Sequence, residues 1–443
     1  MAPSKLILPP SHPFLSISLA IYDSFGIRVV SSWDFNNKID EKTIEDMFKI
    51  PLLNMRCQNN NTFRDYPTSI ITSPINNIKM IVSSFNVTTK KGECLYSFGF
   101  FFKNDAVFDS PQINEMISNR VKEISYHFKY HISNGNEKYL SELEQRITVS
   151  AIEITELLMG GIKKLKPIYS LLNGDGMTPE NNAQKGKEIF IDDLEFYTYV
   201  LNSHLETQMT TIIEVKDAGG KEYLNLFNFL AHFLLPYQRQ LSSDKVHDMI
   251  IPGFFLQVVG PQTNKVFPYE KLLRFNRPWT YIVLSEKKII KSQNIDSHLS
   301  SFHEYRNNIM LNPKITQKES ESSIIKLQRT YRKETPLKTK LFSNFISDLQ
   351  KLPIRMRSIA CQQKLGEMIN KAIALMEAVT QLISETGASF VSPKPAKDIC
   401  SKIGISLEET KIIVSIAQLF DSKMYRRMYS EREEVLMQMV VTI

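Results

Sequence analysis

Cysteine is scarce in this sequence. The 443 residues include four cysteines, Cys57, Cys94, Cys361 and Cys400, and no two of them form a Cys-x-x-Cys pair. Disulfide frameworks and structural zinc sites need closely paired cysteines, so this spacing argues against both and favours a reducing compartment. We expect the four cysteines to be small buried residues.

Long apolar runs are also lacking. No stretch reaches the roughly 18 residues that a membrane-spanning helix needs. Near the N-terminus, Pro9, Pro10 and Pro13 interrupt the apolar residues that a signal peptide would require. The sequence therefore predicts a cytoplasmic protein whose contact with membranes is peripheral.

The usual motifs for nucleotide binding and nucleophilic catalysis are missing. The chain has no P-loop, no Gly-x-Gly-x-x-Gly and no Gly-x-Ser-x-Gly. Gly219-Gly220 is better explained as a tight turn than as a phosphate site. His127 and His131 share a helical face but lack the neighbouring glutamate and third ligand of a zinc site. We predict no catalytic side chain, no cofactor and no metal.

Charge of one sign is not abundant either. The net charge of +7 is modest for this length, and it predicts no nucleic-acid partner. Positive charge is concentrated in Lys314–Lys340, which has eight Lys or Arg residues and three Glu. Two explanations fit this segment: an exposed, solvated insertion, or a contact with anionic lipid heads or an acidic partner.

The patterns that are present predict two α/β modules. Alternating apolar residues indicate a β-hairpin over 14–35 and further strands at 68–72, 78–87 and 93–102. Apolar stripes at 3–4 residue spacing predict helices at 41–54 and from 113 to 147.

The second half of the chain alternates helices and strands. We predict helices at 192–208 and 221–235 and strands at 209–215, 253–259 and 279–284, followed by helices alone from 322 onward. A strand–helix–strand order favours a partly parallel sheet.

The hairpin Tyr22–Trp33 and the collinear segments Ser203–Thr207, Gly253–Gln257 and Ser430–Gln438 resemble the chromosome 9 open reading frame 72 family of longin–DENN proteins. The resemblance implies an α/β fold. A longin domain with about five antiparallel strands and flanking helices would precede a DENN module with a mixed sheet and an all-helical C-terminal part. The implied limits are 1–162 for the longin domain, 163–190 for a linker, 191–311 for the central DENN domain, 312–335 for a basic flexible insertion and 336–443 for the helical downstream DENN domain and tail.

The same resemblance implies a regulator of Rab- or Arf-class small GTPases in autophagy and endosomal or lysosomal trafficking. Such a protein acts as an exchange factor, or as the non-catalytic subunit of a GTPase-activating complex. Its implied partners are a second longin–DENN protein of the Smith–Magenis chromosome region family and a WD-repeat protein. In related complexes the partner supplies the arginine finger, and the corresponding loop here offers Lys103.

Two further readings stay open. One is a scaffold that dimerises with a second DENN protein and recruits it to lysosomes without acting on GTPases. The other concerns Arg64, Arg355 and Arg357, which are either arginines that act on a bound GTPase or ordinary surface residues.

We expect the partner interface to use the N-terminal hairpin and the C-terminal helical group, where aromatic, Arg and Met side chains typical of interfaces gather. For Leu436 and Met437, packing within the local core is an equal alternative. The candidate interface residues are Asp23, Gly26, Arg28, Trp33, Tyr425, Arg426, Tyr429, Arg432, Leu436 and Met437.

Overall fold

The computed structural model consists of two compact units. The first comprises Met1–Ile162 and Glu304–Ile324, and the second comprises Lys163–His303 and Ile325–Ile443. The described residues are 12–23, 25–35, 39–57, 68–73, 77–89, 92–103, 117–118, 120–122, 124–125, 128–129, 144, 147–155, 189–216, 222–261, 267–310, 317–335 and 340–429. Most of the expected linker at 163–190 lies outside them.

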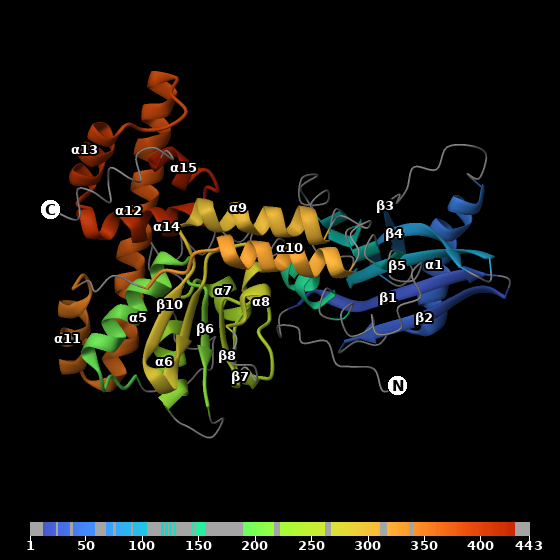
Figure 1. The fold of residues 1–443 in the computed structure, drawn as a ribbon, viewed down its shortest axis with the longest axis horizontal. Coiled ribbons are helices and arrows are strands. Elements are labelled where there is room, and N and C mark those ends of the chain that lie inside the picture. Colours follow the sequence, from blue (N-terminus) through green and yellow to red (C-terminus); the bar gives the residue numbers. More distant parts are fainter. Residues whose placement is uncertain are drawn as a thin grey trace. The chain divides into compact units, whose positions relative to one another are not determined.

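The first unit is built on a five-stranded antiparallel sheet (Figure 1). Its elements are β1 (Phe14–Asp23), β2 (Gly26–Asp34), α1 (Glu41–Cys57), β3 (Thr68–Ser73), β4 (Ile78–Thr89) and β5 (Gly92–Lys103). The strand order is β2-β1-β5-β4-β3, so β2 and β3 form the two edges. The hairpin and the three further strands predicted from alternation are confirmed.

Both faces of this sheet are buried because β5 is apolar on both sides. Phe98, Phe100 and Phe102 pack into one core together with helical residues from 117 to 154. Phe101 points to the opposite face, where its ring lies 5.6 Å from that of Phe48 on α1. The two faces therefore carry separate cores on either side of one central strand.

Gly99 allows α1 to approach the sheet closely. A Cβ atom at this position would lie 2.9 Å from Sδ of Met80 and 3.1 Å from Cζ of Phe48. A side chain at this position would force the Met80 thioether to shift and the Phe48 ring to move by a few tenths of an ångström, so glycine favours the close packing of α1 on β4 and β5.

The second unit contains a mixed five-stranded sheet. Its first elements are α5 (Leu194–Glu206), β6 (Thr211–Glu214), α6 (Glu222–Ala231), α7 (Pro236–Gln240), β7 (Ser243–His247), β8 (Leu256–Val259), α8 (Tyr269–Leu273), β9 (Thr280–Val283) and β10 (Lys288–Lys291). The order is β10-β9-β6-β8-β7. Strand β6 pairs in parallel with β8 and β9, as the strand–helix–strand order predicts.

Helices make up the rest of this unit. They are α11 (Ser343–Lys351), α12 (Ile354–Thr386), α13 (Pro393–Ile403), α14 (Leu407–Gln418) and α15 (Met424–Met428), together with most of α9 (Ile295–Tyr305) and the C-terminal part of α10 (Gln317–Thr330). Helix α14 contacts both α12 and α5 (Figure 1), which joins the helical part to the sheet. Its N-terminus has a capping box, in which the Ser406 hydroxyl accepts from Glu409 N at 3.2 Å and the Glu409 carboxylate accepts from Ser406 N at 3.1 Å.

The segment 312–335, which we expected to be a flexible basic insertion, includes helix α10. Residues 317–330 form α10, and the side chains of Leu327 and Tyr331 are 4% and 5% exposed. After the helix, Glu334 forms two backbone hydrogen bonds of 2.9 Å with Lys291 at the open edge of β10. Two buried anchors and a strand-like bridge explain why this segment has a defined structure despite its charge.

Candidate interaction surfaces

The N-terminal hairpin brings Asp23 and Gly26 together at the edge of the first sheet. Asp23 ends β1 and pairs with Gly26 at the start of β2. Gly26 has a φ of +102°, a conformation that a residue with a Cβ atom adopts only with strain. In the turn between them, the side chain of Phe25 is 89% exposed. The hairpin therefore presents a large apolar side chain on a backbone turn that requires glycine.

Strand β2 is an edge strand with features that limit pairing. Ala20 pairs with Val29 and Leu19 with Ser31, so Val30 is an extra residue that bulges out of the ladder. Arg28 is exposed on the same strand. Charged residues and bulges are the means by which natural proteins keep sheet edges from pairing.

Trp33 lies in the core. Its side chain is 8% exposed, packs within the face that includes Phe98 and Phe100, and donates from Nε1 to the Glu144 carboxylate at 3.4 Å. Alternation along β2 turns this position inward. A partner on the surface of β2 would not touch the ring directly.

The opposite edge of the sheet, β3, has none of the protective features of β2. Its six residues are uncharged, and its register with β4 is continuous. The side chain of Ile70 is 44% exposed, and Ile50 and Leu53 are exposed on α1, a helix that contacts β3. An uncharged, regular edge with apolar neighbours is suited to accept a strand from another chain. In the sequence, the uncharged run at 68–73 is the signal that indicates this surface.

The C-terminal candidate residues lie around α15. Tyr425 is half-buried, and its ring lies 4.8 Å from that of Tyr429, which is buried. Arg426 is 74% exposed and reaches Asp296 of α9 at 3.3 Å. Such an exposed ion pair contributes little stability, so Arg426 remains accessible to a partner. Arg432, Leu436 and Met437 lie outside the described residues, and their role as interface residues stays a prediction.

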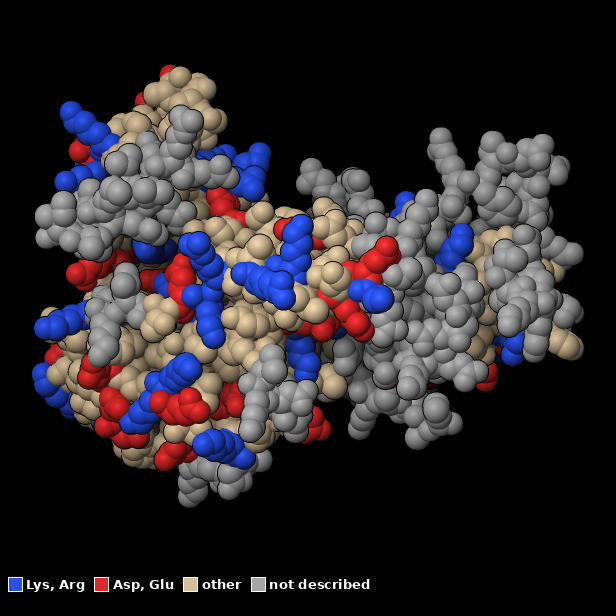
Figure 2. Space-filling view, viewed as in Figure 1, with Lys and Arg blue, Asp and Glu red and all other residues tan. Residues whose placement is uncertain are grey.

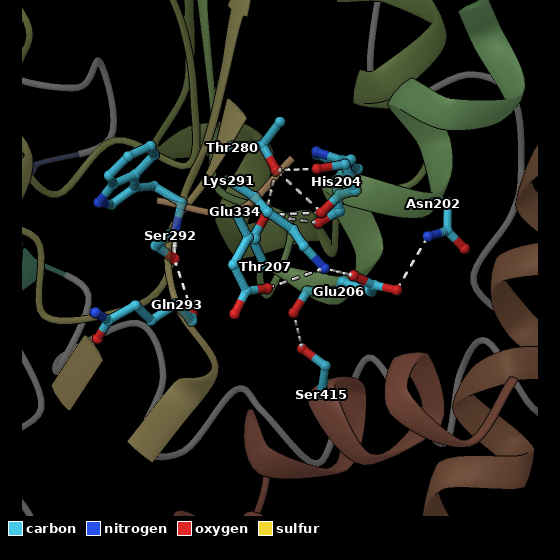
Figure 3. Close-up of polar contacts among 12 residues, drawn as sticks. Asn202, His204, Glu206, Thr207, Thr280, Lys291, Ser292, Gln293, Glu334 and Ser415 are labelled. Atoms are coloured by element: carbon cyan, nitrogen blue, oxygen red, sulfur yellow. Dashed lines mark hydrogen bonds and ion pairs between the residues drawn. The ribbon is translucent and has the colours of Figure 1, made fainter. Parts of the chain in front are cut away.

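A partly buried ion cluster joins four elements of the second unit (Figure 3). The Lys291 ammonium at the end of β10 donates to the Glu206 carboxylate at the end of α5 and lies 3.6 Å from the Glu334 carboxylate. Side chains of Lys291 and Glu206 are 12% and 16% exposed. Burial alone lowers the pKa of Lys291, but the two carboxylates outweigh it and raise that pKa above its ordinary value.

Glu206 also connects the cluster to the helical part. Asn202 donates to its carboxylate at 3.0 Å, and the Ser415 hydroxyl of α14 donates to its backbone carbonyl at 2.8 Å (Figure 3). Buried polar groups are stable only when their partners are in place. The cluster therefore fixes α14 and the segment after α10 relative to the sheet.

Three hydroxyl groups extend this polar network into the interior. Thr280 Oγ1 lies 2.8 Å from both Ser203 Oγ and Thr207 Oγ1 (Figure 3). Next to them, His204 Nδ1 lies 2.8 Å from Thr211 Oγ1. Complete burial lowers the pKa of His204 to about 3, so this imidazole is neutral and acts as a hydrogen-bonding group of the core.

Arg357 stabilises the local fold through hydrogen bonds to the backbone. Its guanidinium donates to the backbone carbonyls of Leu352, Gln350 and Ile189 at 3.1, 2.8 and 2.7 Å. Three carbonyl contacts hold the start of α12 against the segment that leads into α5. Arg64 lies outside the described residues.

His127, His131 and the Gly219-Gly220 pair lie outside the described residues. Within the described part of the chain, no group of three or more His, Cys, Asp or Glu side chains could hold a metal ion. The described helices include none whose length and apolarity would allow it to cross a bilayer.

A five-stranded antiparallel sheet followed by a mixed sheet and a helical part is the architecture of a longin–DENN-type protein. The sequence model of the C9orf72-like protein family matches residues 46–298, which include most of the first sheet and all of the second. The chain belongs to this family, and the resemblance noted from the sequence is confirmed. A comparison with curated proteins finds no match.

Proposed function

We propose that the protein regulates small GTPases of the Rab or Arf class in autophagy and endosomal or lysosomal trafficking. It would act as a guanine-nucleotide exchange factor, or as the non-catalytic longin–DENN subunit of a GTPase-activating complex. Membership of the C9orf72-like family and the longin–DENN-type architecture support this proposal.

The observation that carries the proposal is the edge strand β3, which among the described strands pairs with β4 alone. Regulation of a GTPase by a complex requires a surface that binds a protein partner, and β3 offers an uncharged six-residue edge beside exposed Ile50, Leu53 and Ile70. Pairing with a strand of a second longin–DENN protein would extend the sheet through main-chain hydrogen bonds. A WD-repeat protein would join through that partner.

In this role the chain acts through contacts with other proteins and needs no catalytic side chain of its own. An exchange factor displaces the switch segments of the GTPase and loosens the contacts between phosphate and magnesium. In a GTPase-activating complex, the arginine finger neutralises charge that develops on the transferred phosphate. That finger would come from the partner, since this chain has Lys103 at the end of β5.

Nucleotide kinetics test the proposal. The purified chain, alone and with its co-purified partner, is added to a panel of Rab and Arf proteins, and release of a fluorescent guanine nucleotide and hydrolysis of GTP are measured. We expect a faster release or a faster hydrolysis for at least one GTPase. Unchanged release and hydrolysis across the panel, with the partner still bound, would leave only the scaffold function and refute the regulator.

A further inference from the structure

One side of the C-terminal half of α10 packs against the core of the second unit. Leu327 is buried, and the buried ring of Tyr331 stacks on Trp279 with centroids 6.2 Å apart. The Tyr331 hydroxyl also lies 3.1 Å from Nδ1 of the buried His298. This side of the helix is therefore part of the core, and the opposite side faces outward.

The outward side is basic. At 3.6 residues per turn, Lys326 and Arg329 project away from Leu327, and both are exposed. Arg332 and Lys333 follow directly after the helix and are also exposed. We call these four residues the α10 basic face. Figure 2 shows Lys and Arg side chains gathered where Figure 1 draws this half of the helix.

Nearby carboxylates of the described residues do not neutralise the positive charge of the α10 basic face. Glu334 is the one acidic residue in the sequence from 325 to 335, and it is engaged by Lys291. No carboxylate among the described residues pairs with Lys326, Arg329 or Arg332. Lys333 lies 5.0 Å from the centre of the Phe267 ring, a contact that orients the ammonium without removing its charge.

An apolar side chain lies within the basic face. Ile325 is one turn before Arg329 on the same side of α10, and its side chain is 47% exposed. Favourable interaction of basic residues with the helix C-terminus accounts for Arg329, but it does not account for an exposed isoleucine beside it. Basic residues around an apolar side chain on an outward helix face are typical of surfaces that lie on anionic bilayers.

We propose that the α10 basic face is a docking surface for an anionic phospholipid membrane. Lys326, Arg329, Arg332 and Lys333 contact the headgroups electrostatically, and Ile325 inserts between them. A membrane fits this surface better than an acidic protein because the described residues form an outward face of dispersed charges around one isoleucine. The inference stands apart from GTPase regulation, since it requires no GTPase and no partner chain.

Vesicle flotation tests this surface with the full-length protein alone. The probes are phosphatidylcholine vesicles with and without phosphatidylserine, at about 0.15 M salt, where surface charges are screened beyond roughly 8 Å. We expect binding only to the vesicles that contain phosphatidylserine. The Lys326→Gln/Arg329→Gln variant should bind about 25-fold more weakly, since each basic residue near an anionic bilayer strengthens binding about fivefold.

The matched control is Lys394→Gln/Lys397→Gln, which removes two exposed lysines from α13. Circular dichroism verifies that both variants fold. Binding of the control should equal that of the wild type. The proposal is overturned if phosphatidylserine does not increase the binding of the wild type to vesicles, or if the α13 variant loses as much binding as the α10 variant. It is also overturned if the α10 basic face binds an acidic peptide but no vesicle.

Discussion

Replacing Lys291 by alanine should destabilise the second unit strongly. The change leaves the Glu206 carboxylate, whose side chain is 16% exposed, without its cation. Removing one partner of a buried ion pair costs about 3–5 kcal/mol. Asn202 still donates to Glu206, and some solvent reaches the site, so we expect a loss near the lower limit, about 3 kcal/mol.

Urea unfolding followed by the fluorescence of a single tryptophan measures this loss. The chain has two tryptophans, Trp33 in the first unit and Trp279 in the second, so Trp33→Phe leaves Trp279 as the reporter of the second unit. In this background, Lys291→Ala should lower the unfolding midpoint clearly. A single local reporter is needed because a protein with two units need not unfold in one step.

Two comparison variants separate charge pairing from general damage at this site. Glu334→Gln removes a carboxylate that is 43% exposed and lies 3.6 Å away, so it should cost less than about 1 kcal/mol. Lys291→Met with Glu206→Gln removes both buried charges and should recover most of the loss. Equal midpoints for Lys291→Ala and wild type, or a double variant worse than Lys291→Ala, would refute the reasoning.

Three smaller predictions concern single side chains. Arg357→Ala should destabilise the corner between α11 and α12 by about 2 kcal/mol in urea unfolding. Arg357→Lys should not restore the lost stability, because an ammonium cannot reach three carbonyls as the planar guanidinium does. Burial lowers the pKa of His298 to about 4, below its unfolded value of 6.5, so folding favours the neutral imidazole. The contribution of His298 to stability should thus be full above pH 6.5 and fall toward pH 4, by about 2 kcal/mol at pH 5, and His298→Gln should make the pH profile shallower by that amount. Gly26→Ala should lower the thermal midpoint of unfolding. The φ of Gly26 is +102°, which strains a residue with a Cβ atom by about 1 kcal/mol, and no steric clash adds to this cost because no atom lies near the added methyl group. An unchanged midpoint would show that the turn relaxes.

Periodicity in the sequence predicted the central strands well. Alternating apolar residues predicted a strand at 93–102, and in the structure Phe98, Phe100 and Phe102 face one core while Phe101 faces the other. The parallel arrangement of the second sheet followed from the order of strands and helices. In both cases the signal is strong because burial fixes each side chain.

Short edge strands were missed because they carry little such signal. The β7 sequence Ser243–His247 is mostly polar, and β10 contains two buried residues, Ile289 and Ile290, between lysines. Each strand pairs with a single neighbour, β7 with β8 and β10 with β9, so a short polar or lysine-flanked run is enough to form it. A helix from 322 onward was predicted, but its anchoring was not, because the contacts of Tyr331 with Trp279 and His298 are not visible in a basic sequence.

The interface residues were the hardest to place. Trp33 was a candidate interface residue, and the structure places its side chain in the core. Choosing between the edges β2 and β3 required the strand order and the bulge at Val30, which only pairing reveals.

The measurement that tests the account most directly is affinity purification of the chain with identification of the proteins that accompany it. We expect a second longin–DENN protein and a WD-repeat protein with the wild type. Ile70→Lys on β3 should lose both, whereas Val30→Lys on β2, at a side chain of similar exposure (47% against 44%), should retain them. Retention by Ile70→Lys together with loss by Val30→Lys would contradict the β3 interface, and a wild-type chain that purifies alone would contradict the central claim.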